Sequence, residues 1–228
     1  MEIDWTRQID GYCERLTPAF WAEPINAVTN AAFIIAAIIM LLRVRGNPMA
    51  QLLSVIMLCI GIGSFLFHTV ATAWAALADT APIGIFILVY LYAVTRTMLG
   101  FGRLWSLAIT ALFIPFAAVV VPLVSTVPFL AISGFYWTVP ILLVIYAVII
   151  RRQYPQAARG FVIGAALLSV SIIARSLDEV LCDSLPIGTH FLWHCLNAVM
   201  LAYMIHVYHR HWQSHGRAHV LAAGRTGR

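Results

Sequence analysis

Charged residues are scarce in this chain, and lysine is absent altogether. Only 10% of its 228 residues are charged, whereas 62% are hydrophobic and the mean hydropathy is +0.90. Soluble domains usually carry about 25% charged residues, so too little charge remains here to cover a water-facing surface. Disorder is excluded as well, because disordered chains contain few apolar residues and much net charge. The composition therefore predicts a membrane protein.

Several signals of other protein classes are also missing. No basic stripe with interleaved aromatic residues is present, so the net charge of +5 does not indicate nucleic-acid binding. The sequence shows no internal repeat, and nothing in it predicts a protein partner. Residues 1–23 are polar and acidic, so we expect no cleavable signal peptide ahead of the first apolar run.

Apolar runs bounded by charge, proline or glycine predict one all-α domain over residues 1–228, a bundle of seven transmembrane helices. Each crossing needs about 20 residues, which leaves room for short loops, an N-terminal segment at 1–23 and a tail at 210–228. The expected spans are 24–43, 50–71, 77–96, 104–123, 129–150, 160–178 and 188–209.

The arginines predict the orientation of this bundle. Most of the 14 arginines fall after the first, third and fifth spans or in the C-terminal tail. The positive-inside rule makes that side cytoplasmic, with the N-terminus outside. All nine acidic residues then lie on or near the outer side, either to bind something cationic or to avoid the anionic inner leaflet. Short loops and arginine-only usage favour a bacterial inner membrane, with the outer side facing the periplasm.

Polar residues able to bind a metal gather at the outer ends of three predicted helices. Ser64 and His68 lie four residues apart near the end of the second span, and Asp79 lies at the start of the third. His190 and His194 lie four apart at the start of the seventh, so they share one helical face. Three histidines with an open fourth position are typical of a catalytic zinc site.

Plainer interpretations of the same residues remain open. A histidine at a helix end is more often interfacial or hydrogen-bonded than a metal ligand. Ser64, close to Gly61 and Gly63, is compatible with close helix packing. A serine-hydrolase triad is the rival chemistry, but the sequence has no G-x-S-x-G motif. The histidines of the tail, from His206 onward, lie on the wrong side for this site, and we expect them to be solvated.

The sequence also resembles a known family, the alkaline ceramidases, within the superfamily of seven-helix membrane hydrolases that includes the adiponectin receptors. The matching motifs run in family order along nearly the whole chain: Tyr12-Cys13-Glu14, Ala22-Glu23-Pro24-Ile25-Asn26 followed by Thr29-Asn30, Gly61-x-Gly63-Ser64-Phe65-Leu66-Phe67-His68, Asp79-x-x-Pro82, Cys182-Asp183-Ser184-Leu185 and His190-x-x-x-His194.

This resemblance implies an intramembrane zinc amidase that cleaves the N-acyl bond of ceramide or a related lipid amide. By motif position, His68, His190 and His194 are the zinc ligands. Asp79 is the acid/base that exchanges protons with the attacking water and the leaving amine, and Ser64 orients the water or supports the oxyanion. The products are a fatty acid and a sphingoid base, both able to leave into the lipid.

The resemblance further implies a calcium site and a disulfide. Asp10, Tyr12, Glu14 and Glu23 are the possible calcium ligands, but Asp10 is offset by one position from the family pattern. Leu16 replaces an expected asparagine, and the spacing from Glu14 to Glu23 is shorter. Solvated interfacial acids are the alternative.

The family pairing joins Cys13 to Cys182, both in outer segments where an oxidising compartment permits a bridge. Cys59 and Cys195 fall within helices and are expected to pack there. Arg175 is expected to pair with Asp178 or with a lipid headgroup.

Two other functions fit part of this pattern. A different acyl lipid is possible as substrate, because nothing in the sequence reads a headgroup. A seven-helix lipid receptor or binding protein with a structural zinc is the rival from another class, and it needs no general base at Asp79. A transporter is disfavoured because the sequence has no inverted repeat or broken pair of midplane helices.

Overall fold

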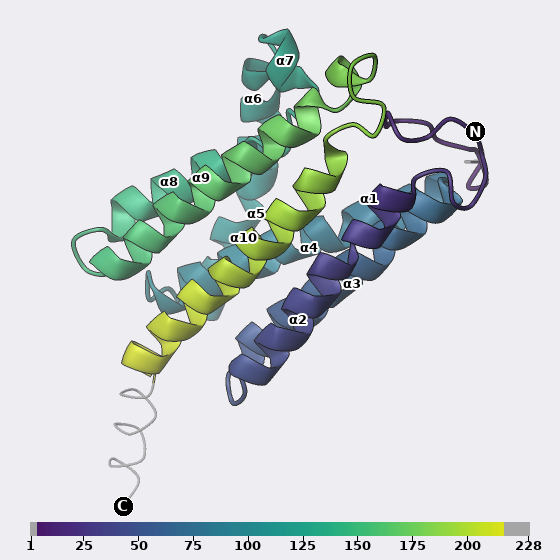
Figure 1. Ribbon diagram of the computed structural model, residues 1–228. Coiled ribbons are helices and arrows are strands. Elements are labelled where there is room, and N and C mark those ends of the chain that lie inside the picture. Colours follow the sequence, from purple (N-terminus) through teal and green to yellow (C-terminus); the bar gives the residue numbers. More distant parts are fainter. Residues whose placement is uncertain (1–3, 217–228) are drawn as a thin grey trace, which may run out of the picture.

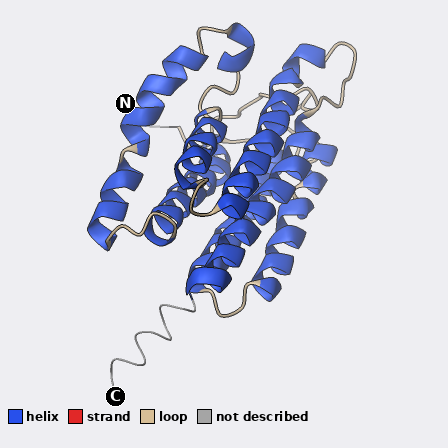
Figure 2. Cartoon of the chain, turned by 90° about the vertical axis from the view of Figure 1, so that its left-hand side faces the viewer, coloured by secondary structure: helices blue, strands red, loops and turns tan. Residues whose placement is uncertain are grey.

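The computed structural model of the chain describes residues 4–216, so most of the expected tail, 217–228, lies outside the described residues. Over 4–216 the chain is helical and forms no strand; one isolated bridge joins Gln8 to Thr72. Figure 2 shows this all-helical architecture. The helices are α1 (Pro24–Thr29), α2 (Ala31–Arg43), α3 (Pro48–Val70), α4 (Ala73–Thr97), α5 (Arg103–Ala111), α6 (Phe113–Val124), α7 (Pro128–Ala131), α8 (Thr138–Ile150), α9 (Pro155–Leu177), the 3₁₀ turn η1 (Glu179–Leu181), α10 (His190–His211) and the π-helical turn η2 (Trp212–Gly216).

Six segments in the described part of the chain are long and apolar enough to cross a membrane, which confirms a polytopic all-α membrane protein. They are Pro24–Arg43, Pro48–Val70, Ala73–Thr97, Arg103–Val124, Pro155–Leu177 and His190–His215. The first comprises α1 and α2, and the fourth comprises α5 and α6.

The expected span at 129–150 does not form one long helix, so the predicted count of seven is not confirmed. Its first part is the single turn α7 followed by turns at 132–137, and only Thr138–Ile150 is regular α-helix. Thirteen helical residues extend about 20 Å, which is short of the roughly 30 Å hydrocarbon core. Arg175 and Ser176 at the end of α9 both bind the Ser133 hydroxyl, which fixes the irregular segment against α9.

Local sequence explains where the long helices begin. Asn47 caps α3 by accepting a hydrogen bond from the Ala50 amide at 3.1 Å, and Pro48 occupies the first helical position. Proline also opens α1 and α9. Apolar composition does the rest, because a backbone within lipid must satisfy its own hydrogen bonds.

Small residues set the closest helix contacts. A side chain at Gly63 of α3 would collide with the Ala78 carbonyl of α4, and one at Gly164 of α9 would collide with Met204 of α10. In Figure 1, α10 lies between the α1–α3 group and the α8–α9 pair. The end of α3 and the starts of α4 and α10 therefore meet at one end of the bundle, beneath the N-terminal segment.

Candidate metal centre

Three buried histidines converge at this end of the bundle. His68 lies near the end of α3, and His190 and His194 lie one turn apart at the start of α10. One candidate ligand atom from each lies within 4.8 Å of the other two, the only such group of three or more among residues 4–216. The sequence prediction that these three residues come together is thus confirmed, and the group could bind a metal such as zinc.

Each of the three rings keeps a buried nitrogen without a hydrogen-bond partner. These atoms are Nε2 of His68, Nδ1 of His190 and Nε2 of His194. Buried polar atoms are normally paired, and three unpaired imidazole nitrogens in one place are a donor set that suits zinc. The residues present therefore fit the metal that the resemblance implies.

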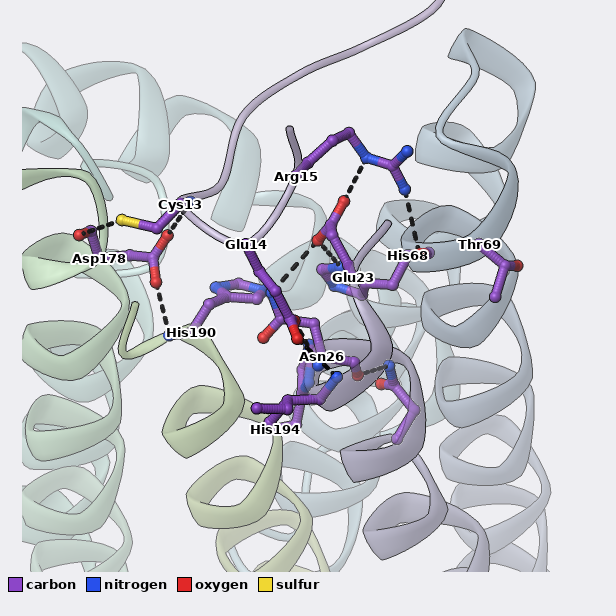
Figure 3. A network of polar contacts seen from close by, with 12 residues as sticks. Cys13, Glu14, Arg15, Glu23, Asn26, His68, Thr69, Asp178, His190 and His194 are labelled. Carbon is purple, nitrogen blue, oxygen red and sulfur yellow. Dashed lines mark hydrogen bonds and ion pairs between the residues drawn. The ribbon is translucent and has the colours of Figure 1, made fainter. Parts of the chain in front are cut away.

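Glu23 orients the His68 ring (Figure 3). Glu23 Oε2 lies 2.6 Å from Nδ1 of His68, and an ionised carboxylate can only accept, so Nδ1 carries the proton and donates. The other nitrogen, Nε2, then presents its lone pair to the centre. A metal-binding histidine is typically held by such an outer hydrogen bond, which fixes both its tautomer and its direction.

Thr29 does the same for His194. Its Oγ1 lies 2.9 Å from Nδ1 of His194 and donates to the Ile25 carbonyl at 2.8 Å. With its own proton committed there, the hydroxyl accepts from the ring, which leaves Nε2 of His194 free to face the centre. The family motif contains Thr29, but its contact with His194, 165 residues away, was not predicted.

Asp178 fixes the start of α10, which carries His190. Its Oδ1 accepts from the amides of Thr189 and His190 at 2.6 and 2.8 Å, and its Oδ2 accepts from the Cys13 amide at 3.0 Å. The expected pairing with Arg175 is wrong. The Arg175 guanidinium instead donates to Ser133 and lies over the rings of Tyr136 and Trp193.

The N-terminal segment is fastened over the centre by the predicted disulfide. Cys13 and Cys182 are bonded, which confirms the pairing that the resemblance implied. The adjacent Tyr12 ring stacks on His190 with centroids 3.8 Å apart and lies 5.1 Å from the His68 ring. Burial raises the pKa of the Tyr12 phenol, which therefore stays neutral.

Asp79 and Ser64 lie near His68. Asp79 is on the first turns of α4, near Ser64 and His68 of α3. The close approach of α4 to Gly63 of α3 brings these side chains together. Ser64 is buried, whereas Asp79 is half-buried.

The acidic residues proposed as calcium ligands lie in different surroundings and bind different groups. Asp10 is exposed, and Glu14 accepts from the amides of Ile25 and Asn26 at 2.7 and 2.8 Å, which caps α1. Glu23 binds His68 and, at Oε1, the Arg15 guanidinium. Burial alone raises the pKa of Glu23, but these two partners outweigh it and hold that pKa below its usual value. With both carboxylates engaged, the described residues give calcium no support.

An apolar cavity of about 80 Å³ lies next to the centre, between α4, α8, α9 and α10. Phe33 on its wall has its ring 6.3 Å from that of His194, and Trp193 on the wall precedes His194 in α10. Its other walls are built largely from aliphatic and aromatic side chains, including Phe86, Leu143 and Phe161. The centre therefore adjoins a space suited to hydrocarbon.

Comparison with known proteins agrees with this geometry. No curated protein matches the chain. A family model described as Ceramidase matches residues 6–221, which include the three histidines, Ser64, Asp79 and the disulfide. The match spans nearly the whole sequence, and the chain belongs to the ceramidase family, whose members are hydrolases.

Proposed function

We propose that this protein is a zinc-dependent amidase that hydrolyses the N-acyl bond of ceramide or a related lipid amide, releasing a fatty acid and a sphingoid base. The observation that carries the proposal is the convergence of three buried, unpartnered imidazole nitrogens beside Asp79. Among the described residues no fourth protein ligand joins the group. Three ligands and an open position are typical of catalytic rather than structural zinc.

His68, His190 and His194 would hold the zinc ion. When bound, zinc supplies a Lewis acid that polarises the amide carbonyl and makes water a stronger nucleophile at neutral pH. Glu23 and Thr29 keep His68 and His194 in the tautomers and orientations that this binding needs. Tyr12 covers the face of His190 and excludes water from it.

Asp79 is the proposed acid/base. It would accept a proton from the attacking water and deliver one to the nitrogen of the leaving amine, as general acid–base catalysis requires. Ser64, close to Asp79, would hold that water in line or donate to the oxygen that gains negative charge. The apolar cavity beside Phe33 and Trp193 supports a lipid substrate, because it offers hydrocarbon chains a dry wall near the centre.

We also propose that the centre faces the periplasm of a bacterial inner membrane. Arg43 ends α2, Arg45 follows it, and Arg210 lies near the end of α10. In Figure 1 these two helix ends lie at the opposite end of the bundle from the start of α10. This separation supports an orientation with the N-terminus outside and the C-terminus cytoplasmic.

Asp79→Asn separates an enzyme from a lipid receptor with structural zinc. The substitution keeps the shape but cannot exchange protons, so we expect release of fatty acid from N-acyl lipids to fall by about 10²–10⁴-fold. Elemental analysis of the same preparation is expected to show zinc unchanged. Thr80→Ala is the matched control, because the Thr80 hydroxyl is exposed and bonds only within α4.

Unchanged hydrolysis in Asp79→Asn would remove Asp79 from the mechanism. Wild-type protein that holds no zinc and cleaves no member of a panel of N-acyl lipids would end the amidase proposal altogether.

A further inference from the structure

Arg15 is a buried cation in the N-terminal segment above the metal centre. Only 5% of the residue is exposed, and its partner Glu23 is 2% exposed. Nε of Arg15 donates to Glu23 Oε1 at 2.5 Å, so two opposite charges meet away from water. Such a pair costs desolvation, and it is retained only where several hydrogen bonds satisfy both ions.

Both terminal nitrogens of the guanidinium reach backbone carbonyls. Nη1 donates to the carbonyls of Thr17 and Ala19 at 3.2 and 3.5 Å, and Nη2 donates to the carbonyl of His68 at 3.1 Å. Arg15 thus gathers one carboxylate oxygen and three carbonyl oxygens around a positive charge. Oxygens of these two kinds are also what calcium binds in proteins.

Arg15 holds His68 from two directions (Figure 3). Through Nη2 it binds the backbone carbonyl of His68, in the last turn of α3, where helix carbonyls lack partners within the helix. Through Glu23 it fixes the carboxylate that binds the imidazole Nδ1. Asn26 completes the arrangement by donating to Glu23 Oε2 at 3.2 Å.

Both carboxylate oxygens of Glu23 are therefore already engaged by donors. Oε1 is taken by Arg15, and Oε2 is shared by His68 and Asn26. Glu14, the other acid expected to bind calcium, is turned to the amides that begin α1. The residues present do not fit a calcium ion at this place.

We propose that the Arg15 guanidinium takes the place that calcium was expected to have, as a built-in cation that joins the N-terminal segment to the metal centre. Arg15 is a positioning residue: it acts on zinc through Glu23 and His68. Folding and zinc binding are then independent of calcium. The proposal rests on the proposed function in one respect, that the three histidines hold zinc.

The first test uses the purified full-length protein in detergent, in buffer freed of calcium by ion exchange rather than by a chelator that would also remove zinc. Elemental analysis is expected to find zinc without calcium. Addition of millimolar calcium chloride is expected to leave the thermal unfolding midpoint, Tm, unchanged. Bound calcium in stoichiometric amount, or a clear rise in Tm on adding it, would overturn the proposal.

The second test compares Arg15→Ala with Arg15→Lys and with Arg7→Ala, an exposed arginine of the same segment. Arg15→Ala leaves Glu23 buried without its ion partner, and we expect zinc affinity to fall by about 10–100-fold, as when an outer-shell partner is lost. Arg15→Lys keeps the positive charge but loses the several N–H donors of the guanidinium. We therefore expect its zinc affinity to lie between those of Arg15→Ala and wild type. Arg7→Ala is expected to match wild type.

Competition with a chromophoric chelator measures the zinc affinity, and the visible spectrum of cobalt-substituted protein reports whether His68 keeps its geometry. Should Arg15→Ala fail to fold, Arg15→Lys can be compared with wild type instead, and a smaller loss of zinc affinity is expected. Equal zinc affinity and equal cobalt spectra in all three variants would refute the positioning role. Because none of these readouts involves lipid, they stand even if wild-type protein hydrolyses no amide.

Discussion

The two ends of α10 carry the same residue type in very different surroundings. At its start, His190 and His194 are buried and each keeps an unpartnered nitrogen directed to a shared centre with His68. Toward its far end, His209 is bonded to Asn47, and His215 donates to the carbonyl of His211. A metal centre therefore needs converging and unsatisfied nitrogens, and a mere abundance of histidine does not make one.

The two ends differ also in what holds them. The centre is enclosed by contacts from distant segments: Cys182 bonded to Cys13, Asp178 at the start of α10, and Arg15 over His68. The far end is held by ring packing and one polar contact: Tyr154 packs its ring 4.5 Å from that of His211 and 4.9 Å from that of His215, and Asn47 binds His209. A disulfide and charged groups therefore fix the end that carries the metal centre, whereas ring packing is prominent at the other end.

The largest effect is expected from His194→Ala. Loss of one of three ligands removes bound zinc and, with it, hydrolysis of the lipid amide, by more than the roughly 100-fold that an outer-shell change costs. Elemental analysis and fatty acid release, measured on the same preparation, check this. Full zinc content in His194→Ala would show that the centre lies elsewhere.

An intermediate effect is expected from Thr29→Val. The variant keeps the shape of Thr29 but removes the oxygen that accepts from Nδ1 of His194, so zinc affinity is expected to fall about 10-fold. Thr29→Ser is the matched control, because it restores the oxygen at the same position. If Val and Ser variants bind zinc equally, Thr29 does not orient the ring.

The smallest effect is expected from His215→Ala in η2, just beyond the far end of α10. Its side chain is exposed, and substitutions of this kind usually change stability by no more than about 0.5 kcal/mol. We expect zinc content and turnover to equal those of wild type. Loss of zinc here would mean that histidine number, rather than convergence, governs metal binding.

Much of the site was predictable because its spacing is local. Ser64 and His68, like His190 and His194, share a helical face at four-residue spacing, and that part of the prediction needed no tertiary information. The length of the fifth apolar run led to the prediction of one long helix over 129–150, because hydropathy does not show where a chain turns. Residues 132–137 leave the helix where Arg175 and Ser176 bind Ser133, and an apolar window over 129–150 conceals this.

Partners across the sequence could not be predicted from patterns. Arg175 was expected to pair with Asp178 or with a lipid headgroup, yet Asp178 caps α10 and binds the amide of Cys13. Glu23 was expected to bind calcium, yet Arg15 occupies its carboxylate. In both cases several donors of similar chemistry could bind the same carboxylate. Only the path of the folded chain decides which donor lies close enough to do so.

By itself the sequence determined that this chain is an all-α membrane protein, and that three histidines able to bind one metal lie near helix ends at one side. Composition and helical periodicity are sufficient for that, because lipid forces every backbone group into helical hydrogen bonds. Tertiary structure decided which nitrogens of His68 and His194 face the centre, and that Arg15 supplies the cation above it. Those choices depend on hydrogen bonds between residues far apart in sequence, whose geometry exists only when the helices have packed.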